Sequence, residues 1–116
     1  MGSNSILLVE DDPDVRALLE HILLAEGYRV DVAATAMHAT SLLDANSYGV
    51  VLTDGVLPDG NGVDIADKAK ARGMPALIVT GYALRFAKED LARHGFLRKP
   101  LRARELLDAV ARHLKM

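Results

Sequence analysis

The sequence has no cysteine and little net charge, and its hydrophobic runs are short. The absence of cysteine excludes disulfides, thiolate catalysis and cysteine-based zinc or iron–sulfur sites. It also suits a reducing compartment, so we expect a cytoplasmic location. The formal net charge of −2 provides no broad basic field for the phosphates of nucleic acid. We therefore expect no nucleic-acid binding by this chain alone.

The short apolar runs also argue against membrane insertion. Segments such as Val50–Leu52 and Ala76–Val79 are far shorter than the roughly 20 apolar residues that span a bilayer. The start of the chain lacks the basic segment and long apolar stretch of a signal peptide. We expect a soluble protein with no membrane partner.

The length and composition fit one domain. The chain has 116 residues, of which 50% are hydrophobic, so it can bury one core but is too short for two domains. Residues 1–3 resemble a cloning remnant and are left out of the fold prediction. We expect a single domain over residues 4–116.

Short strand-like runs alternate with helical patterns from one end of the chain to the other. The predicted strands cover residues 5–9, 29–33, 50–53, 76–80 and 95–98. Three of these five runs are almost wholly apolar, which is typical of parallel strands covered by helices on both faces.

The clearest helical pattern follows the first strand. One helix face is formed by Val15, Leu18, Leu19, Ile22 and Leu23. Asp12 is the predicted N-cap before Pro13, and Gly27 is the predicted C-terminal glycine. Further helices are predicted over residues 36–45, 62–72, 84–94 and 103–115. The result is an α/β fold: a (βα)₅ flavodoxin-like, doubly wound parallel five-stranded sheet in the order 2-1-3-4-5.

Acidic residues follow two strands that are neighbours in this order. Glu10 and Asp11 follow the first strand, and Asp54 follows the third. Like charges this close disfavour ionisation unless a cation joins them, and a set of carboxylate oxygens favours a hard cation such as Mg²⁺. Since Mg²⁺ keeps positions for water and a substrate phosphate, the edge is suited to a phosphoryl group.

The same edge is expected to gain a hydroxyl and a cation. Thr80 ends the fourth strand and precedes Gly81, while Lys99 ends the fifth. Both side chains can bind phosphate oxygens. Asp54 is the predicted nucleophile because it is the single acid at the end of a buried strand, whereas Glu10 and Asp11 form the pair that a metal needs.

Four segments together carry a resemblance to a known family. They are Leu-Val-Glu-Asp-Asp-Pro at 8–13, Leu-Thr-Asp-Gly-Val-Leu-Pro-Asp-Gly-Asn-Gly at 52–62, Val-Thr-Gly-Tyr at 79–82 and Phe-Leu-Arg-Lys-Pro at 96–100. From residue 6 to residue 114 the sequence resembles the receiver domain of two-component response regulators, of the chemotaxis-regulator-like kind. The four segments have the order and strand-end positions that this family requires.

The resemblance implies a phosphoacceptor domain rather than a metabolic enzyme. Asp54 is then the phosphoacceptor, with Thr80 and Lys99 on the phosphoryl oxygens. Mg²⁺ is implied on Asp11, on Glu10 mainly through water, on Asp54 and on the backbone carbonyl of Val56. The switch residues are Thr80 and Phe96, and the peptide bond between Lys99 and Pro100 is expected to be cis.

The resemblance also implies the partners. The phosphoryl donor is expected to be a sensor histidine kinase or a histidine phosphotransfer protein in a phosphorelay, and the downstream target is an unknown protein. Transfer to the acceptor is self-catalysed and is followed by slow autodephosphorylation. We expect no output domain and a monomer or weak dimer. The spacing from Thr80 to Lys99 is shorter than usual for the family and predicts a short or irregular fourth helix.

Three other kinds of protein share parts of this pattern. A haloacid-dehalogenase-type phosphatase needs a second aspartate two residues from the nucleophile, but positions 52 and 56 are Leu and Val. A flavodoxin-like nucleotide binder needs a Gly-rich or Ser/Thr-rich phosphate loop after the first strand. In this sequence acidic residues follow that strand, and they would repel a phosphate group. The main alternative is a degenerate receiver that acts only as a protein-binding module.

Several residues also have plain structural explanations. The acidic run at residues 10–12 could simply complement a helix dipole, and Asp12 is expected to be only a cap. The histidines show no paired ligand spacing, so we expect ordinary surface positions for His21, His38, His94 and His113.

Overall fold

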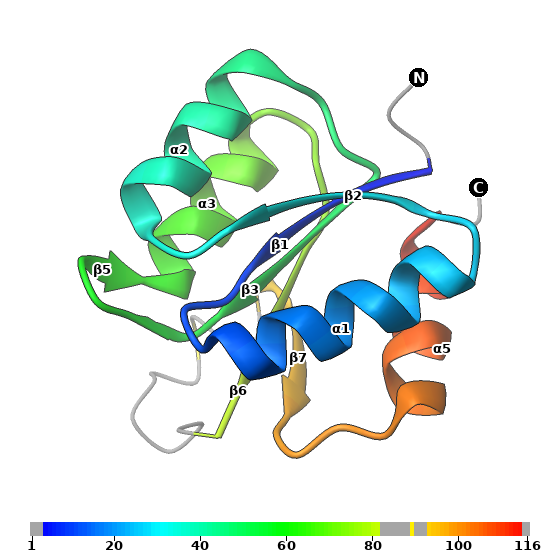
Figure 1. Ribbon diagram of the computed structural model, residues 1–116. Coiled ribbons are helices and arrows are strands. Elements are labelled where there is room, and N and C mark those ends of the chain that lie inside the picture. Colours follow the sequence, from blue (N-terminus) through cyan, green and yellow to red (C-terminus); the bar gives the residue numbers. More distant parts are fainter. Residues whose placement is uncertain (1–3, 82–88, 90–92, 115–116) are drawn as a thin grey trace.

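Five parallel strands form one sheet in the computed structural model, which describes residues 4–81, 89 and 93–114 (Figure 1). The strands are β1 (Ser5–Val9), β2 (Arg29–Ala33), β3 (Val50–Asp54), β6 (Ala76–Thr80) and β7 (Gly95–Arg98). Their order in the sheet is β2-β1-β3-β6-β7, and each neighbouring pair is parallel. This is the predicted order 2-1-3-4-5, so the fold prediction is confirmed.

Helices cover both faces of the sheet. They are α1 (Pro13–Ala25), α2 (Ala36–Ala45), α3 (Gly62–Ala71) and α5 (Ala103–Leu114). Figure 1 shows α2 and α3 together on one side of the strands and α1 and α5 on the other. The helix predicted over residues 84–94 falls mostly outside the described residues. None of the described helices is long and apolar enough to span a membrane.

Each strand of the sheet interior contributes side chains to two separate cores. Along β1, Leu7 and Val9 pack into the core beneath α2 and α3, whereas Ile6 and Leu8 pack into the core beneath α1 and α5. All five residues of β3 are buried, and so are all five of β6. Burial on both faces explains why these strands read as continuous apolar runs.

The first helix begins and ends as its sequence predicts. The Asp12 carboxylate accepts hydrogen bonds from the backbone amides of Asp14, at 2.9 Å, and Val15, at 3.2 Å. Gly27 has a φ of +100°, a left-handed conformation that glycine adopts without strain. The Asp12 cap places the start of α1 directly after the acidic end of β1.

A small hairpin after β3 was not predicted. Its antiparallel strands are β4 (Val56–Leu57) and β5 (Gly60–Asn61), and Pro58 and Asp59 form the turn. Strands of two residues leave almost no periodic pattern in a sequence, although Pro-Asp-Gly is a turn signal. The hairpin carries the chain from Asp54 to the start of α3, so it borders the predicted site.

Candidate metal-binding site at the carboxyl edge of the sheet

Three carboxylates meet at the edge where β1 and β3 end. One carboxylate oxygen from each of Glu10, Asp11 and Asp54 lies within 4.8 Å of the other two. The register explains this, because Val9 pairs with Thr53 and the residue that follows each of them in the chain is an acid. Glu10 and Asp54 are buried, with 2% and 8% of their surface exposed, whereas Asp11 faces solvent. The arrangement of ligand atoms could hold a metal ion.

Lys99 joins the two buried acids. Its Nζ donates to Oε1 of Glu10 at 2.7 Å and to Oδ2 of Asp54 at 3.2 Å. Burial by itself would lower the pKa of Lys99, but its hydrogen bond and Coulomb attraction to Glu10, helped by Asp54, leave that pKa raised. The lysine therefore stays protonated at neutral pH and brings one positive charge to the acidic edge.

The pKa of Glu10 is raised. Burial is the main cause, the hydrogen bond from Lys99 opposes it, and the charge of Asp54 adds to the rise. The buried position of Glu10 thus favours its neutral form, and ionising Glu10 there costs free energy. A divalent cation at this edge would reduce that free-energy cost.

The loop between β1 and α1 is fixed by hydrogen bonds from Arg16 and by one bond within the loop. The Arg16 guanidinium, one turn into α1, donates to the backbone carbonyl of Glu10 at 2.9 Å and reaches that of Asp11 at 3.5 Å. The amide of Asp12 donates to Oε2 of Glu10 at 3.2 Å. Arg16 was not among the predicted site residues, because sequence spacing alone does not show that its side chain turns back toward the loop.

The loop after β3 is fixed from within. The amide of Val56 donates to Oδ1 of Asp54 at 3.3 Å, and the amide of Gly62 donates to the carbonyl of Gly55 at 2.9 Å. A Cβ atom at Gly62 would collide with the backbone carbonyl of Asp54. The chain can therefore pass this close behind the predicted acceptor only because position 62 has no side chain.

These residues line an open pocket of about 560 Å³. Its walls are formed by Glu10, Asp11, Asp12, Val15, Asp54, Val56, Gly81 and Lys99. Oxygen ligands, one lysine and open volume above the carboxylates suit a hard divalent cation together with a phosphate-sized anion.

Two predicted residues lie beside this pocket rather than in its lining. Thr80 ends β6 and is fully buried, and its carbonyl accepts a hydrogen bond from the amide of Lys99 at 3.2 Å. Phe96 is half-buried on β7 and pairs with Ile78 of β6. The Lys99–Pro100 peptide bond is cis, as the sequence led us to expect.

One histidine prediction is wrong. His21 and His38 are exposed, but the His94 side chain is only 1% exposed and its Nε2 lies 2.7 Å from Oδ1 of Asp67 on α3. Arg93 also binds the Asp67 carboxylate, with 3.0 Å from its NH2 group to each oxygen. The partner is 27 positions away in the sequence, so no local pattern could reveal this pair.

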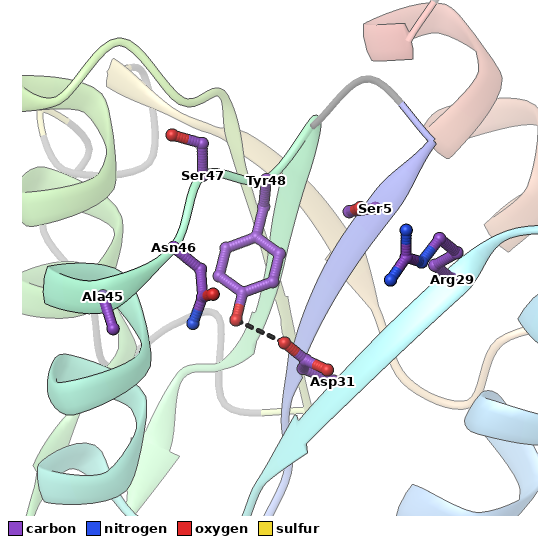
Figure 2. A pocket seen from close by; sticks show the side chains of 7 residues that line it. All are labelled: Ser5, Arg29, Asp31, Ala45, Asn46, Ser47 and Tyr48. Carbon is purple, nitrogen blue, oxygen red and sulfur yellow. Dashed lines mark hydrogen bonds between the residues drawn. The ribbon is translucent and has the colours of Figure 1, made fainter. Parts of the chain in front are cut away.

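A second pocket, of about 400 Å³, lies at the opposite edge of the sheet. Figure 2 shows the seven residues that line it, which are Ser5, Arg29, Asp31, Ala45, Asn46, Ser47 and Tyr48. The buried Tyr48 donates its hydroxyl to Asp31 at 2.7 Å, and burial together with this bond raises the pKa of Tyr48. Because Ser5 and Arg29 begin their strands while Asp54 ends β3, this pocket is separate from the acidic one.

The comparison with known families covers almost the whole chain. The family model described as "Response regulator receiver domain" matches residues 6–111. The transcriptional regulatory protein TcrA of Mycobacterium tuberculosis is 33% identical in an alignment of length 106 that covers 87% of this chain and 42% of TcrA. The chain thus spans less than half the length of this curated relative.

Two solved structures are similar along nearly their whole length. A CheY-like response regulator receiver domain protein from Methanospirillum hungatei is 31% identical with a TM-score of 0.84, and the match covers 95% of this chain and 92% of that one. The receiver domain of the sensor histidine kinase PA1611 from Pseudomonas aeruginosa is 29% identical with a TM-score of 0.85, covering 97% and 98%. That structure has a magnesium ion coordinated in its active site cleft.

Proposed function

The chain belongs to the response regulator receiver domain family, and on this basis we propose that it is a phosphorylation switch whose acceptor is Asp54. The phosphoryl donor is a phosphohistidine on a sensor histidine kinase or a histidine phosphotransfer protein. The observation that carries the proposal is the cluster of Glu10, Asp11 and Asp54, with Lys99 bridging the two buried acids.

The residues present fit Mg²⁺. All the candidate side-chain ligands are carboxylate oxygens, Asp11 is open to solvent, and the exposed Val56 lines the same pocket. In this proposal Asp11, Asp54 and the carbonyl of Val56 hold the ion directly, and Glu10 holds it mainly through water. When bound, the ion neutralises phosphoryl oxygens and helps to orient the donor.

The protein side chains then carry out an in-line displacement. An oxygen of Asp54 forms a bond to phosphorus while the bond from phosphorus to the donor nitrogen breaks, leaving a neutral histidine on the donor. The ammonium group of Lys99, already 3.2 Å from Asp54, stabilises the negative charge of the transferred group. Thr80 supplies a hydroxyl donor once it reaches the phosphoryl oxygens. Water later hydrolyses the acyl phosphate slowly, which resets the domain.

The switch in this proposal involves Thr80 and Phe96. They lie on neighbouring strands, where Ile78 pairs with Phe96 and Thr80 pairs with Arg98. Phosphorylation replaces about one negative charge by about two, and the added charge biases a two-state arrangement of these residues. The domain then controls a downstream protein in the cytoplasm.

Intact-mass spectrometry after incubation with acetyl phosphate tests the acceptor. We expect one added phosphoryl group that requires Mg²⁺, is absent in Asp54→Asn, and persists in Asp14→Asn, which removes an exposed acid at the start of α1. A folded protein that gains no phosphoryl group, and does not respond to beryllofluoride, would leave only the protein-binding module. An adduct that survives in Asp54→Asn would refute the choice of acceptor.

A further inference from the structure

One side chain anchors the hairpin next to the acidic pocket to α2, a helix that lies much earlier in the sequence. The two carboxylate oxygens of Asp59, in the turn between β4 and β5, accept hydrogen bonds from the first amides of α2. The distances are 2.7 Å to the amide of Ala36 and 3.0 Å to that of Met37. The α2 cap, Thr35, separately accepts from the amide of His38 at 3.1 Å. Asp59 therefore adds to the ordinary cap of α2 rather than replacing it.

The same turn packs closely against α2. A Cβ atom added at Gly60 would lie 3.1 Å from Cβ of Ala36, which is tighter than most such contacts. Leu57, at the other end of the turn, is buried in the core beneath α2 and α3, where Ala36 also packs. The hairpin is thus held on α2 by two hydrogen bonds, one close backbone approach and one buried side chain.

The anchored hairpin also carries a predicted metal ligand. Val56 pairs with Asn61 across the hairpin, is 40% exposed and lines the acidic pocket. Its amide donates to Oδ1 of Asp54. Only two residues separate Val56 from Asp59, so a shift of the turn on α2 moves the Val56 carbonyl relative to the carboxylates.

The carboxylate of Asp59 is well suited to this anchoring. Its two hydrogen bonds from the Ala36 and Met37 amides lower the pKa of Asp59, so it is ionised at neutral pH. An ionised carboxylate is also favoured by the positive end of the α2 dipole.

From these contacts we infer that Asp59 is a positioning residue for Mg²⁺: it holds the β4–β5 hairpin on α2 so that the Val56 carbonyl faces the ion. The inference rests on the proposed function, because it assumes that the cluster of Glu10, Asp11 and Asp54 binds Mg²⁺. Asp59 itself does not line the acidic pocket and is not proposed to touch the ion.

The test is a calorimetric Mg²⁺ titration of the full chain without any phosphoryl donor. We expect Asp59→Ala to bind Mg²⁺ about tenfold more weakly than wild type, the size typical of removing a residue that orients a metal ligand. Asp59→Asn keeps one acceptor oxygen and should lose less affinity. Gly60→Val pushes the turn off α2 without changing any charge, and should weaken binding as Asp59→Ala does.

Asp14→Asn is the matched control for charge. It removes one exposed acid at the start of α1, whose side chain forms no hydrogen bond or ion pair with the described residues, and should change Mg²⁺ affinity by less than about twofold because exposed charges are screened. Urea unfolding of every variant in Mg²⁺-free buffer separates loss of fold from loss of affinity. Amide exchange at Ala36 and Met37 should quicken in Asp59→Ala but not in Asp14→Asn.

The outcomes distinguish the two proposals. If wild type binds Mg²⁺ and both Asp59→Ala and Gly60→Val bind it equally well, the positioning role is refuted while the proposed function stands. If wild type fails to bind Mg²⁺, the proposed function fails first and the inference falls with it. Should Asp59→Ala not fold, Asp59→Asn and Gly60→Val decide the question.

Discussion

At the scale of single residues, the acidic pocket combines groups that oppose one another. Lys99 compensates the charge of Glu10 and Asp54, yet its own positive charge lies where a divalent cation is proposed to bind. We therefore expect Lys99 to stabilise the pocket without metal and to reduce its affinity for the proposed cation.

Replacing Lys99 by Met separates these two effects. A single and a double positive charge about 6 Å apart repel by about 1.4 kcal/mol in a water-like dielectric, so Lys99→Met should bind Mg²⁺ about tenfold more tightly. The same variant should be phosphorylated by acetyl phosphate about a hundredfold more slowly, because a donor to the transferred group is lost. Titration calorimetry and timed intact-mass spectra measure the two quantities. Tighter metal binding with an unchanged phosphorylation rate would remove Lys99 from the proposed chemistry.

Glu10 makes the stability of the fold depend on pH. Its pKa in the folded protein lies above its ordinary value of 4.5, so the folded state holds this proton more tightly than the unfolded chain does. Below pH 4.5 Glu10 is protonated and contributes favourably to the stability of the folded state. That contribution is lost as pH rises through the raised pKa, so ionised Glu10 lowers the stability of the folded state at neutral pH.

Glu10→Gln should therefore resist urea better than wild type at neutral pH in Mg²⁺-free buffer. The advantage should vanish as pH falls below 4.5, where Glu10 is protonated in both states. Urea midpoints across this pH range provide the check. A variant less stable than wild type at neutral pH would show that the bond to Lys99 outweighs the cost of burial.

At the scale of secondary-structure elements, two contacts join α3 to the sheet, and the first of them lies directly behind the predicted acceptor. Gly62 begins α3 directly behind the carbonyl of Asp54, and His94 ties the start of β7 to Asp67 on α3. Both contacts join α3 to strands that carry site residues.

Gly62→Ala should be strongly destabilising. The new methyl group collides with a backbone carbonyl that cannot move without shifting the end of β3, an overpacking cost of about 2–3 kcal/mol. Gly81→Ala is the control, because a Cβ atom there would have only an ordinary 4.0 Å contact with Lys99. Urea unfolding measures the stability of both variants, and Gly62→Ala should have much the lower midpoint. Equal midpoints would mean that the start of α3 can shift at little cost.

His94→Leu tests the second contact. Its nearly buried imidazole loses a hydrogen bond to a carboxylate that is partly exposed, so we expect a loss of about 1 kcal/mol. Asp67→Asn and the double variant complete a cycle, and the two single effects should not add because the residues are in contact. Additive effects would show that the pair contributes no coupling energy.

At the scale of the whole molecule, Mg²⁺ should act as a stabilising ligand. An ion that binds the folded chain and not the unfolded chain raises stability by about 2.7 kcal/mol when its concentration is a hundred times the dissociation constant. We expect the thermal midpoint to rise with added Mg²⁺, to fall back with EDTA, and to respond far less in Asp11→Asn. An equal rise in that variant would place the ion elsewhere.

Much of the fold was predictable because the sheet is buried on both faces. Continuous apolar runs identified β3 and β6, and the Asp12 and Gly27 signals gave the bounds of α1 to within two residues. The register of β1 and β3 follows from the same pattern, so the meeting of Glu10, Asp11 and Asp54 could be foreseen. The roles of Thr80 and Phe96 stay predictions.

The contacts that could not be predicted from the sequence join polar side chains to partners that are distant along the chain. The contacts of Asp59 with α2, of His94 with α3 and of Tyr48 with β2 join residues 17 to 27 positions apart, through single polar side chains. No periodicity encodes such pairs. Arg16 is closer, six residues from Glu10, but its direction depends on the rotamer of a long side chain.

The central position of β3 has a mechanical consequence. This strand is hydrogen-bonded to β1 on one side and β6 on the other, and its five residues are buried between two helix layers. Bending β3 would require its paired neighbours and both helix layers to move with it, whereas the edge strands β2 and β7 are each paired on one side only among the described strands. We therefore expect a change of charge at Asp54 to alter the side chains and loops around it rather than the position of the strand that carries it.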